Sequence, residues 1–215
     1  MSIVKVEGAS KAFKEVKVFE NFSMEIKEGS ITIINGPSGC GKSTLLNMIG
    51  LLDTPDAGTI TVMGESNIKP FSKKAEKLLR EKLGYLFQNF ALVDDETVEY
   101  NLLLAMENVK GVDKKASIKE ALEKVGLKNY EKKKIYKCSG GEQQRIAIAR
   151  LLLKPCKLVL ADEPTGSLDH ENKQVVISLL KELQKMGKTI IIVTHDEELM
   201  EIGEEHIKLQ KIHSI

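Results

Sequence analysis

The chain has 215 residues, which is enough for one substantial hydrophobic core and makes a second full domain unexpected. Its composition, with 42% hydrophobic and 29% charged residues, is ordinary for a globular protein, and a net charge of +1 gives no overall field to attract nucleic acid or acidic lipid. The N-terminal sequence lacks a signal pattern, and no stretch reaches the ~18 apolar residues that span a bilayer. We therefore expect a protein that stays in the cytoplasm.

The first part of the chain combines antiparallel strands with a helix. Alternating apolar and polar positions are typical of half-buried strands, and they occur in residues 3–13, 16–26 and 59–63. The segment 72–82 has a helical pattern with Ser72 as its N-cap, and residues 83–88 return to a strand pattern.

Strand signals vanish between residues 89 and 137. Two helical patterns there, 97–110 and 114–125, predict a helical insertion between the two halves of an α/β core. The basic run 131–134 (EKKK) is interpreted as a solvated helix end without a function. The elements expected beyond it are a helix after Ser139, a buried strand at 158–161, a helix at 171–186, a strand at 189–193 and a short terminal hairpin within 207–215.

One stretch, residues 31–48 (ITIINGPSGCGKSTLLNM), contains a β-branched strand, a glycine-rich turn and an apolar-periodic helix. In this context the pattern G-x-x-x-x-G-K-[ST] predicts a P-loop for nucleotide phosphates rather than a chance glycine-rich turn. The glycines let backbone N–H groups surround the phosphates, Lys42 would reach the β- and γ-phosphates, and the Ser43 hydroxyl would bind Mg²⁺. The residues expected to hold the nucleotide are Gly36, Pro37, Ser38, Gly39, Cys40, Gly41, Lys42, Ser43 and Thr44.

An acidic pair, Asp162 and Glu163, follows the apolar strand at 158–161. An isolated pair of this kind would be interpreted as a helix cap or a surface turn. In a chain with a P-loop, Asp162 is instead expected to hold Mg²⁺ directly or through water. Glu163 lies one residue further on and could polarise an attacking water as a general base.

Five motifs occur in a fixed order, namely GPSGCGKST, Gln88, SGGEQQR at residues 139–145, LVLADEPTGSLD, and His195 in IIVTHD. In this combination the sequence resembles the ATP-binding subunit of ABC transporters over nearly its whole length. The short separation between Gly36 and Ser139 leaves no room for the long coiled coil of the DNA-repair and chromosome-maintenance relatives.

The resemblance implies an α/β fold, a P-loop NTPase core with a mainly parallel sheet, an N-terminal antiparallel β subdomain and a helical insertion. It also implies a single ABC ATPase domain spanning residues 1–215. Within it, residues 1–88 and 155–215 would form the core with the antiparallel layer, and residues 89–154 would form the helical subdomain with the signature motif.

The resemblance further implies roles for single residues. Phe13 matches the aromatic residue that stacks on adenine, where tyrosine is usual, although taken alone it would be interpreted as a core strand residue. Gln88 matches the residue that senses Mg²⁺ and the γ-phosphate, and His195 matches the switch histidine that contacts the γ-phosphate. The catalytic residues implied are Glu163, His195 and Lys42, and the metal ligands implied are Ser43, Gln88 and Asp162.

The signature motif matches residues that contact ATP bound by another copy, through the glycines and the helix N-terminus. Asp169 matches the loop that crosses between subunits. The signature residues expected to contact the nucleotide are Ser139, Gly140, Gly141 and Glu142. Because the signature must face a phosphate held by another subunit, the active unit is expected to be a homodimer with two ATP molecules at its interface.

An integral membrane permease subunit is expected to dock near Gln88–Tyr100, which would place the chain on the inner face of the cell membrane, and no nucleic-acid partner is expected. The three cysteines, Cys40, Cys138 and Cys156, show no metal-ligand spacing and are interpreted as reduced thiols. Cys40 and Cys138 would nevertheless lie near one interface of the closed dimer, so we hypothesise that oxidation could cross-link them.

Two segments, ADEPTGSLD and FQNFALVDDETVEYN, resemble the branch of lipoprotein-release, macrolide-export and bacteriocin-export ATPases. The sequence therefore predicts an ATP-hydrolysing subunit that powers a membrane transporter, exporting or extracting a peptide, lipoprotein or drug-like substrate. The alternative is a non-transport ABC ATPase that acts on a ribosome or a nucleic acid. A P-loop kinase ranks last, because it would lack SGGEQQR.

Overall fold

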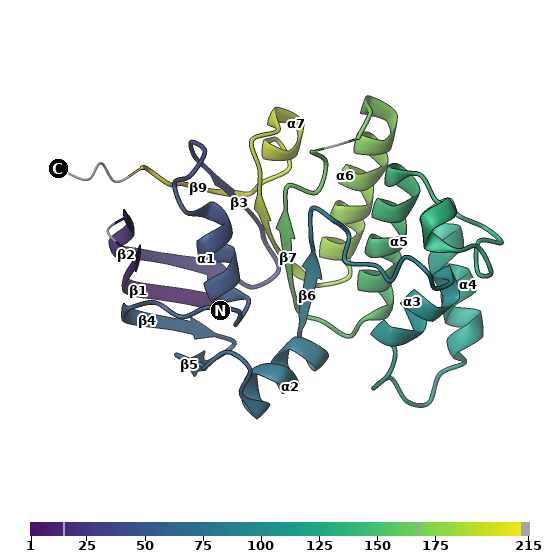
Figure 1. Ribbon diagram of the computed structural model, residues 1–215, viewed down its shortest axis with the longest axis horizontal. Coiled ribbons are helices and arrows are strands. Elements are labelled where there is room, and N and C mark those ends of the chain that lie inside the picture. The colour runs from purple at the N-terminus through teal and green to yellow at the C-terminus, as the bar shows by residue number, and fades with distance from the viewer. Residues whose placement is uncertain (15, 167, 212–215) are drawn as a thin grey trace.

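The computed structural model describes residues 1–14, 16–166 and 168–211. An antiparallel sheet and a parallel sheet lie next to each other, and most helices cover the side of the parallel sheet that faces away from the antiparallel one (Figure 1). The antiparallel sheet has the strand order β2-β1-β4-β5, with β1 (Ser2–Phe13), β2 (Val16–Lys27), β4 (Ala57–Val62) and β5 (Glu65–Ser66). The parallel sheet has the order β6-β7-β8-β3-β9, with β3 (Ile31–Asn35), β6 (Leu83–Leu86), β7 (Leu158–Asp162), β8 (Thr189–Val193) and β9 (Glu205–Lys208).

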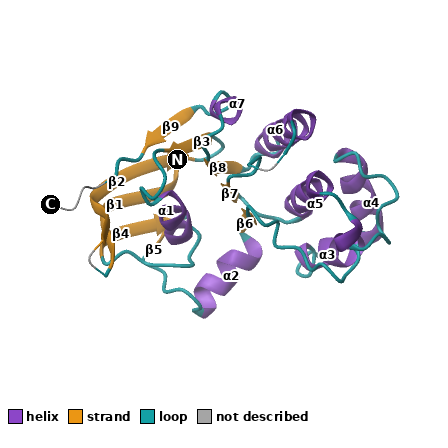
Figure 2. Ribbon diagram, turned by 45° about the horizontal axis from the view of Figure 1, so that its top comes forward, coloured by secondary structure: helices purple, strands orange, loops and turns teal. Residues whose placement is uncertain are grey.

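The helices fall into two groups. Helices α1 and α2 lie close to the antiparallel sheet, whereas α5 and α6 run side by side beyond the parallel sheet, with α3 and α4 next to α5 (Figure 2). The helices are α1 (Lys42–Ile49), α2 (Lys73–Glu81), α3 (Val98–Ala105), α4 (Lys114–Lys124), η1 (Ile135–Lys137, a 3₁₀ turn), α5 (Gly140–Leu153), α6 (His170–Lys185) and α7 (Glu197–Met200). Within the described part of the chain, none of the helices combines the length and the apolar character that crossing a bilayer requires.

The inner strands β3, β7 and β8 are buried on both faces, which explains why they are nearly continuous apolar runs. On one face Ile33, Ala161 and Ile192 pair across neighbouring strands and pack in a core with α3, α4, α5 and α6. On the other face Ile34 and Leu160 pack in a core shared with α1 and the antiparallel sheet. Because the strands are parallel, their carboxyl ends meet at one edge, where open α/β sheets bind ligands.

Most of the predicted elements are confirmed within a few residues of their ends. The strands at 3–13, 16–26 and 59–63 pair antiparallel, as expected. Ser72 and Ser139 cap their helices by accepting hydrogen bonds from the backbone N–H three residues on. These caps could be predicted because they depend only on neighbouring residues.

Two boundaries differ from the prediction. The strand expected to reach Gln88 ends at Leu86, where the chain leaves the sheet in a turn. The helix expected over 97–110 ends at Ala105, because the Met106 N–H bonds to Leu103 in a tighter turn. Three short elements, β5, η1 and α7, were not expected at all.

The expected terminal hairpin is wrong for the residues that the structure describes. Residues 205–208 instead form β9, which pairs parallel with β3 at the sheet edge. The buried Leu209 holds this strand in place, and its N–H donates to the Asn35 carbonyl at 2.8 Å. Residues 212–215 of the expected hairpin lie outside the described residues. The division of the chain at residues 88/89 and 154/155 stays a prediction.

Candidate active site

A cavity of about 700 Å³ opens at the carboxyl edge of the parallel sheet, within the range of about 300–1,000 Å³ typical of ligand sites. It is lined by segments that lie far apart in the sequence, from the start of the chain, the P-loop, and the ends of β6, β7 and β8. The lining residues are Phe13, Val18, Gly36, Ser38, Gly39, Gly41, Lys42, Ser43, Thr44, Gln88, Asp162, Glu163, Val193 and His195.

The P-loop connects β3 to α1 through three glycines with positive φ. Gly36, Gly39 and Gly41 have φ values of 153°, 75° and 95°. A Cβ atom on Gly41 would lie 2.2 Å from the Val18 side chain, so only glycine lets β2 pack this close to the loop. Gly41 is also the N-cap of α1, and no side chain among the described residues caps it. The first N–H groups of α1 therefore remain for an anion.

The Lys42 side chain folds back over the loop. Its Nζ donates to the carbonyl oxygens of Gly36 at 2.9 Å and Pro37 at 3.1 Å, which leaves one of its three N–H donors for a phosphate. Among the described P-loop residues, Pro37 and Cys40 do not line the cavity. Cys40 is buried beneath the loop, so only its backbone could contact a nucleotide.

Asp162 is the last residue of β7, and Glu163 follows it with a φ of 46°. A left-handed conformation at a residue with a side chain costs about 1–3 kcal/mol and is typical of functional sites. The Glu163 N–H donates to the Val193 carbonyl at 2.9 Å, which holds this conformation against β8. Burial raises the pKa of Asp162, the Ser43 hydroxyl opposes this, and the neighbouring Glu163 charge raises the pKa further.

Glu163 and His195 contact each other directly. The distance from His195 Nδ1 to Glu163 Oε1 is 2.8 Å, and the Thr194 hydroxyl donates to Oε2 at 3.2 Å. Glu163 thus engages Nδ1 of the ring, and Nε2 is the ring nitrogen that remains for a ligand. The sequence predicted both residues for the site but not this contact.

Gln88 lies beyond the end of β6, at the start of a turn that α5 holds in place. Phe90 and Ala91 both have positive φ, at 61° and 48°. Arg150 of α5 donates to their carbonyl oxygens, at 2.9 Å from Nη2 to Phe90 and 2.7 Å from Nη1 to Ala91. Sequence reasoning missed Arg150, because no local pattern connects it to a loop 60 residues earlier.

Phe13 lies at the end of β1 and is 50% exposed, so it is not a core strand residue. Its ring forms part of the cavity wall beside Val18. The Lys11 ammonium lies 5.2 Å from the ring centroid, which holds one side of this aromatic platform.

The model of the ABC transporter family matches residues 19–166, which is more than half of the chain. This chain belongs to the ABC transporter family. The arginine transport ATP-binding protein ArtM of Bacillus subtilis is 42% identical over 199 residues, which cover 90% of this chain and 81% of that protein. The lipoprotein-releasing system ATP-binding protein LolD of Bacteroides fragilis is 37% identical over 211 residues, which cover 96% of this chain and 97% of that protein.

The fold is also similar to that of a solved ABC cassette. The dimeric, post-hydrolysis structure of the ATP-binding cassette MJ0796, bound to ADP and Pi, has a TM-score of 0.86 and 33% sequence identity. The match covers 98% of this chain and 97% of that chain. These findings confirm both the resemblance and the α/β fold class that it implied.

The ABC signature lies at the start of α5, and within the described chain none of its residues lines the cavity. Ser139 Oγ accepts from the Glu142 N–H at 3.2 Å, and Glu142 Oε2 accepts from the Ser139 N–H at 2.8 Å, a capping box. Gly141 is buried against α6, where a Cβ would lie 2.6 Å from the Asn172 side chain. Packing within the chain therefore requires this glycine.

Asp169 is the exposed N-cap of α6 and also lies outside the cavity among the described residues. It accepts from the Asn172 N–H at 2.8 Å, and hydrogen bonds from Asn172 lower its pKa. The Asn172 amide also donates to Asp169 and accepts from Arg145 of α5. Asn172, which sequence reasoning missed, thus joins the loop of Asp169 to the signature helix.

The three cysteines and the described histidines other than His195 do not line the cavity. Cys40, Cys138 and Cys156 are buried free thiols, and burial raises the pKa of Cys138. The oxidative cross-link between Cys40 and Cys138 stays a prediction. His170 and His206 are exposed, and His213 lies outside the described residues.

Proposed function

We propose that this chain is the ATP-binding and ATP-hydrolysing subunit of a membrane ABC transporter, working as a homodimer that holds two ATP molecules at its interface. The main support for the proposal is that the P-loop, the acidic pair, Gln88 and His195 line one and the same cavity. Family membership and the ATP-binding relatives support the same function. The relatives give no support to the alternative of an ATPase acting on a ribosome or a nucleic acid.

ATP would lie with its adenine on Phe13 and its phosphates in the P-loop. Lys42 and the N-terminus of α1 would neutralise charge on the phosphates as the bond to the γ-phosphorus breaks. Glu163 would accept a proton from the attacking water while the oxygen of that water bonds to the γ-phosphorus. His195, held by Glu163 through Nδ1, would donate its Nε2–H to a γ-phosphate oxygen, which requires a proton on both ring nitrogens.

The residues present fit a Mg²⁺ ion. The oxygen donors of Ser43 and Asp162 are the hard ligands that Mg²⁺ prefers, and Gln88 lines the same cavity. Among the described residues no group of three His, Cys, Asp or Glu side chains could hold a metal ion, so Mg²⁺ would need phosphate oxygens and water as further ligands. When bound, Mg²⁺ would supply charge neutralisation at the phosphate oxygens.

The position of the signature supports the homodimer. Ser139 and Gly140 are exposed at the start of α5, away from the cavity of their own chain. A second copy would bring its signature helix, and its Asp169 loop, against the phosphates. The dimeric state of MJ0796 supports this arrangement.

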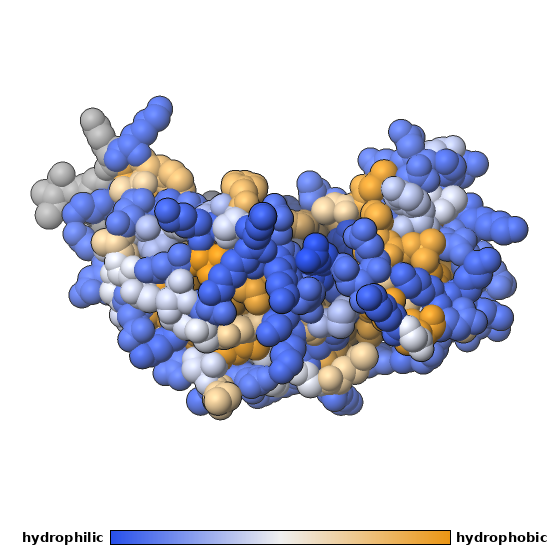
Figure 3. Space-filling model, turned by 90° about the horizontal axis from the view of Figure 1, so that it is seen from below, coloured by the Kyte–Doolittle hydropathy of each residue, from blue (hydrophilic) through white to orange (hydrophobic). Residues whose placement is uncertain are grey.

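The permease would dock on the face that carries α2 and α3. A groove of about 320 Å³ between these helices is lined by apolar residues from the turn near Gln88 and from α3, among them Phe87, Ala91 and Leu104. Leu104 is 50% exposed and Tyr100 is 43% exposed. Figure 3 shows apolar groups among the hydrophilic ones on this face. The chain would then sit in the cytoplasm, on the inner face of the cell membrane.

The substrate would be chosen by the permease. ArtM carries the name of an arginine transport protein and LolD that of a lipoprotein-releasing system. The motif resemblance described above favours export or extraction of a peptide, lipoprotein or drug-like compound. Co-purification with a membrane protein that stimulates ATP hydrolysis would support the transporter, whereas stimulation by ribosomes or DNA alone would overturn it.

The hydrolytic role is tested with Glu163→Gln, measured by phosphate release and by binding of a fluorescent ATP analogue. We expect nucleotide binding close to that of the unaltered chain and turnover reduced by about 10²–10⁴, the usual contribution of a general base. The matched control is Glu120→Gln, which removes an exposed carboxylate on α4. Turnover near wild type in Glu163→Gln would remove Glu163 from the role of base.

A further inference from the structure

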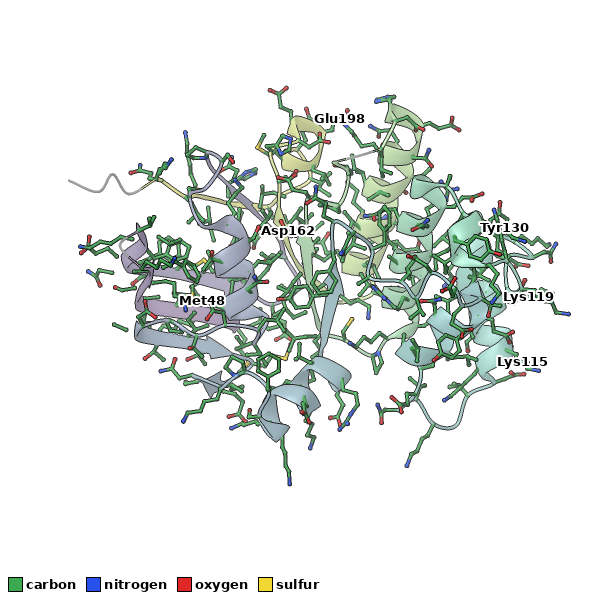
Figure 4. All side chains as sticks on the ribbon, in the orientation of Figure 1. Met48, Lys115, Lys119, Tyr130, Asp162 and Glu198 are labelled. Carbon is green, nitrogen blue, oxygen red and sulfur yellow. The ribbon has the colours of Figure 1, made fainter. Side chains whose placement is uncertain are left out.

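Outside the cavity, one carboxylate is held on both of its oxygens. Glu142 Oε1 accepts from the Tyr130 hydroxyl at 2.6 Å, and Oε2 accepts from Lys133 Nζ at 2.9 Å and from the Ser139 N–H at 2.8 Å. Lys133 Nζ also lies 4.2 Å from the centroid of the Tyr130 ring. We call Tyr130, Lys133 and Glu142 the Glu142 cluster. Tyr130 lies among the helices, well away from Asp162 (Figure 4).

The Glu142 cluster is partly withdrawn from solvent, because the side chains of Lys133 and Glu142 are 29% and 18% exposed. Burial acts to raise the pKa of Glu142, but hydrogen bonds from Tyr130 and Lys133 outweigh it, so the pKa is lowered. The hydrogen bond to Glu142 raises the pKa of Lys133. Both groups are therefore charged at neutral pH, and their attraction is less screened than that of a fully exposed pair.

The position of Glu142 at the start of α5 makes its pairing with Lys133 important for nucleotide binding. Glu142 is the third residue of α5, whose N-terminus would face the phosphates of a nucleotide on a second copy. Ser139 Oγ already takes the Glu142 N–H, so the N–H groups of Gly140 and Gly141 remain for a phosphate. Apart from its chain neighbours and the adjoining backbone of α5, no atom of the described residues lies within 4 Å of where a Gly140 Cβ would be, so this turn is open. An uncompensated carboxylate there would repel the triphosphate.

We propose that Tyr130 and Lys133 are positioning residues of the ATPase, which neutralise Glu142 and hold it inward so that the first turn of α5 presents N–H groups to the nucleotide of a second copy. The inference rests on the proposed function. It replaces the expectation that Glu142 contacts the nucleotide, because both carboxylate oxygens are engaged within the chain and a carboxylate cannot donate to a phosphate.

The inference also gives a function to one residue of the basic run 131–134. Lys132 is exposed, and Lys134 donates to the Asp95 carbonyl. Lys133 is the member of the run that contacts the signature helix. Lys132→Met is therefore a matched control for Lys133→Met, since both remove one neighbouring positive charge.

The test measures the ATP dependence of turnover, and of dimer formation in the Glu163→Gln background. Lys133→Met should raise the KM for ATP about fivefold and leave kcat within about twofold. Repulsion between unpaired Glu142 and the triphosphate would weaken binding of the ground state and of the transition state equally. Tyr130→Phe should give a smaller rise in the same direction. Lys132→Met should match the unaltered chain.

The decisive comparison repeats Lys133→Met in the Glu142→Gln background. Glutamine keeps the capping box but carries no charge, so removing Lys133 should then raise the KM less than twofold. A merely structural role of Lys133 would give the same loss in both backgrounds, which would overturn the inference. An unchanged KM in Lys133→Met would overturn it as well.

Two further measurements separate this inference from the proposed function. If the unaltered chain neither hydrolyses ATP nor dimerises with it, the proposed function fails before any variant is compared. If the unaltered chain does both while Lys133→Met behaves identically, only the inference fails. Thermal melting, with Lys133→Arg as the charge-conserving variant, identifies a loss that comes from unfolding.

Discussion

Arg150 connects the signature helix to the turn after Gln88, and replacing it with methionine should release that turn. The two hydrogen bonds from the charged guanidinium to the carbonyls of Phe90 and Ala91 contribute about 1.5–3 kcal/mol each. Relaxation of Phe90 and Ala91 from the left-handed conformation would offset this loss by about 1–2 kcal/mol for each residue. The net loss, about 1–2 kcal/mol, corresponds to a local opening that is roughly 5–30 times more frequent.

The assay is amide hydrogen exchange over residues 88–92 in Arg150→Met, compared with α4 as an internal reference. We expect faster exchange in the turn, unchanged exchange in α4 and a lower kcat, because Gln88 would no longer be held at the cavity. Arg150→Lys, which keeps the charge but not the two-pronged geometry, should give an intermediate result. Exchange in the turn equal to that of the unaltered chain would refute the reasoning.

Three other predictions follow from the described contacts. Phe13→Ser should raise the KM for ATP roughly 5- to 150-fold if the ring stacks on a base. Val16→Ser alters an exposed neighbour and should leave the KM unchanged. Equal effects of the two substitutions would remove the stacking role. Gly141→Ala should destabilise the fold by about 1–3 kcal/mol in denaturant unfolding, because its Cβ meets Asn172, and Asn172→Ala should recover part of that loss, so additive losses would contradict the clash. The pKa of Glu142 is lowered in the folded chain, so ionised Glu142 stabilises the fold above its unfolded-state pKa, and this contribution is lost as the pH falls through its folded-state pKa. The free energy of unfolding should therefore fall less steeply with acid in Glu142→Gln, which a pH series of denaturant unfolding would measure.

The parts of the fold that depend on local pattern could be predicted from the sequence. The runs 158–161 and 189–193 are continuously apolar, and both are strands buried on two faces. The P-loop and the acidic pair each follow such a strand, so their meeting at one sheet edge follows from parallel topology. The signature residues were expected to contact a nucleotide held by another copy, and this stays a prediction.

The parts that depend on distant contacts could not be predicted. Strand β9 has the sequence EHIK, whose weak alternation gives no sign that Leu209 anchors it beside β3. Asn172 and Arg150 act through residues far from them in the chain, so no spacing rule identifies them. Lys133 stands in a charge run of the kind that is usually solvated, and only its contact with Glu142 distinguishes it from its neighbours.

The central claim is that the cavity of one chain is half of an ATP site, completed by the signature of a second copy. The most direct test is light scattering of Glu163→Gln with and without ATP. The account predicts that this chain of 23.9 kDa doubles in mass when ATP is added, with one nucleotide bound per chain, and that added Ser139→Glu prevents the doubling. A chain that binds ATP and stays a monomer under these conditions would contradict it.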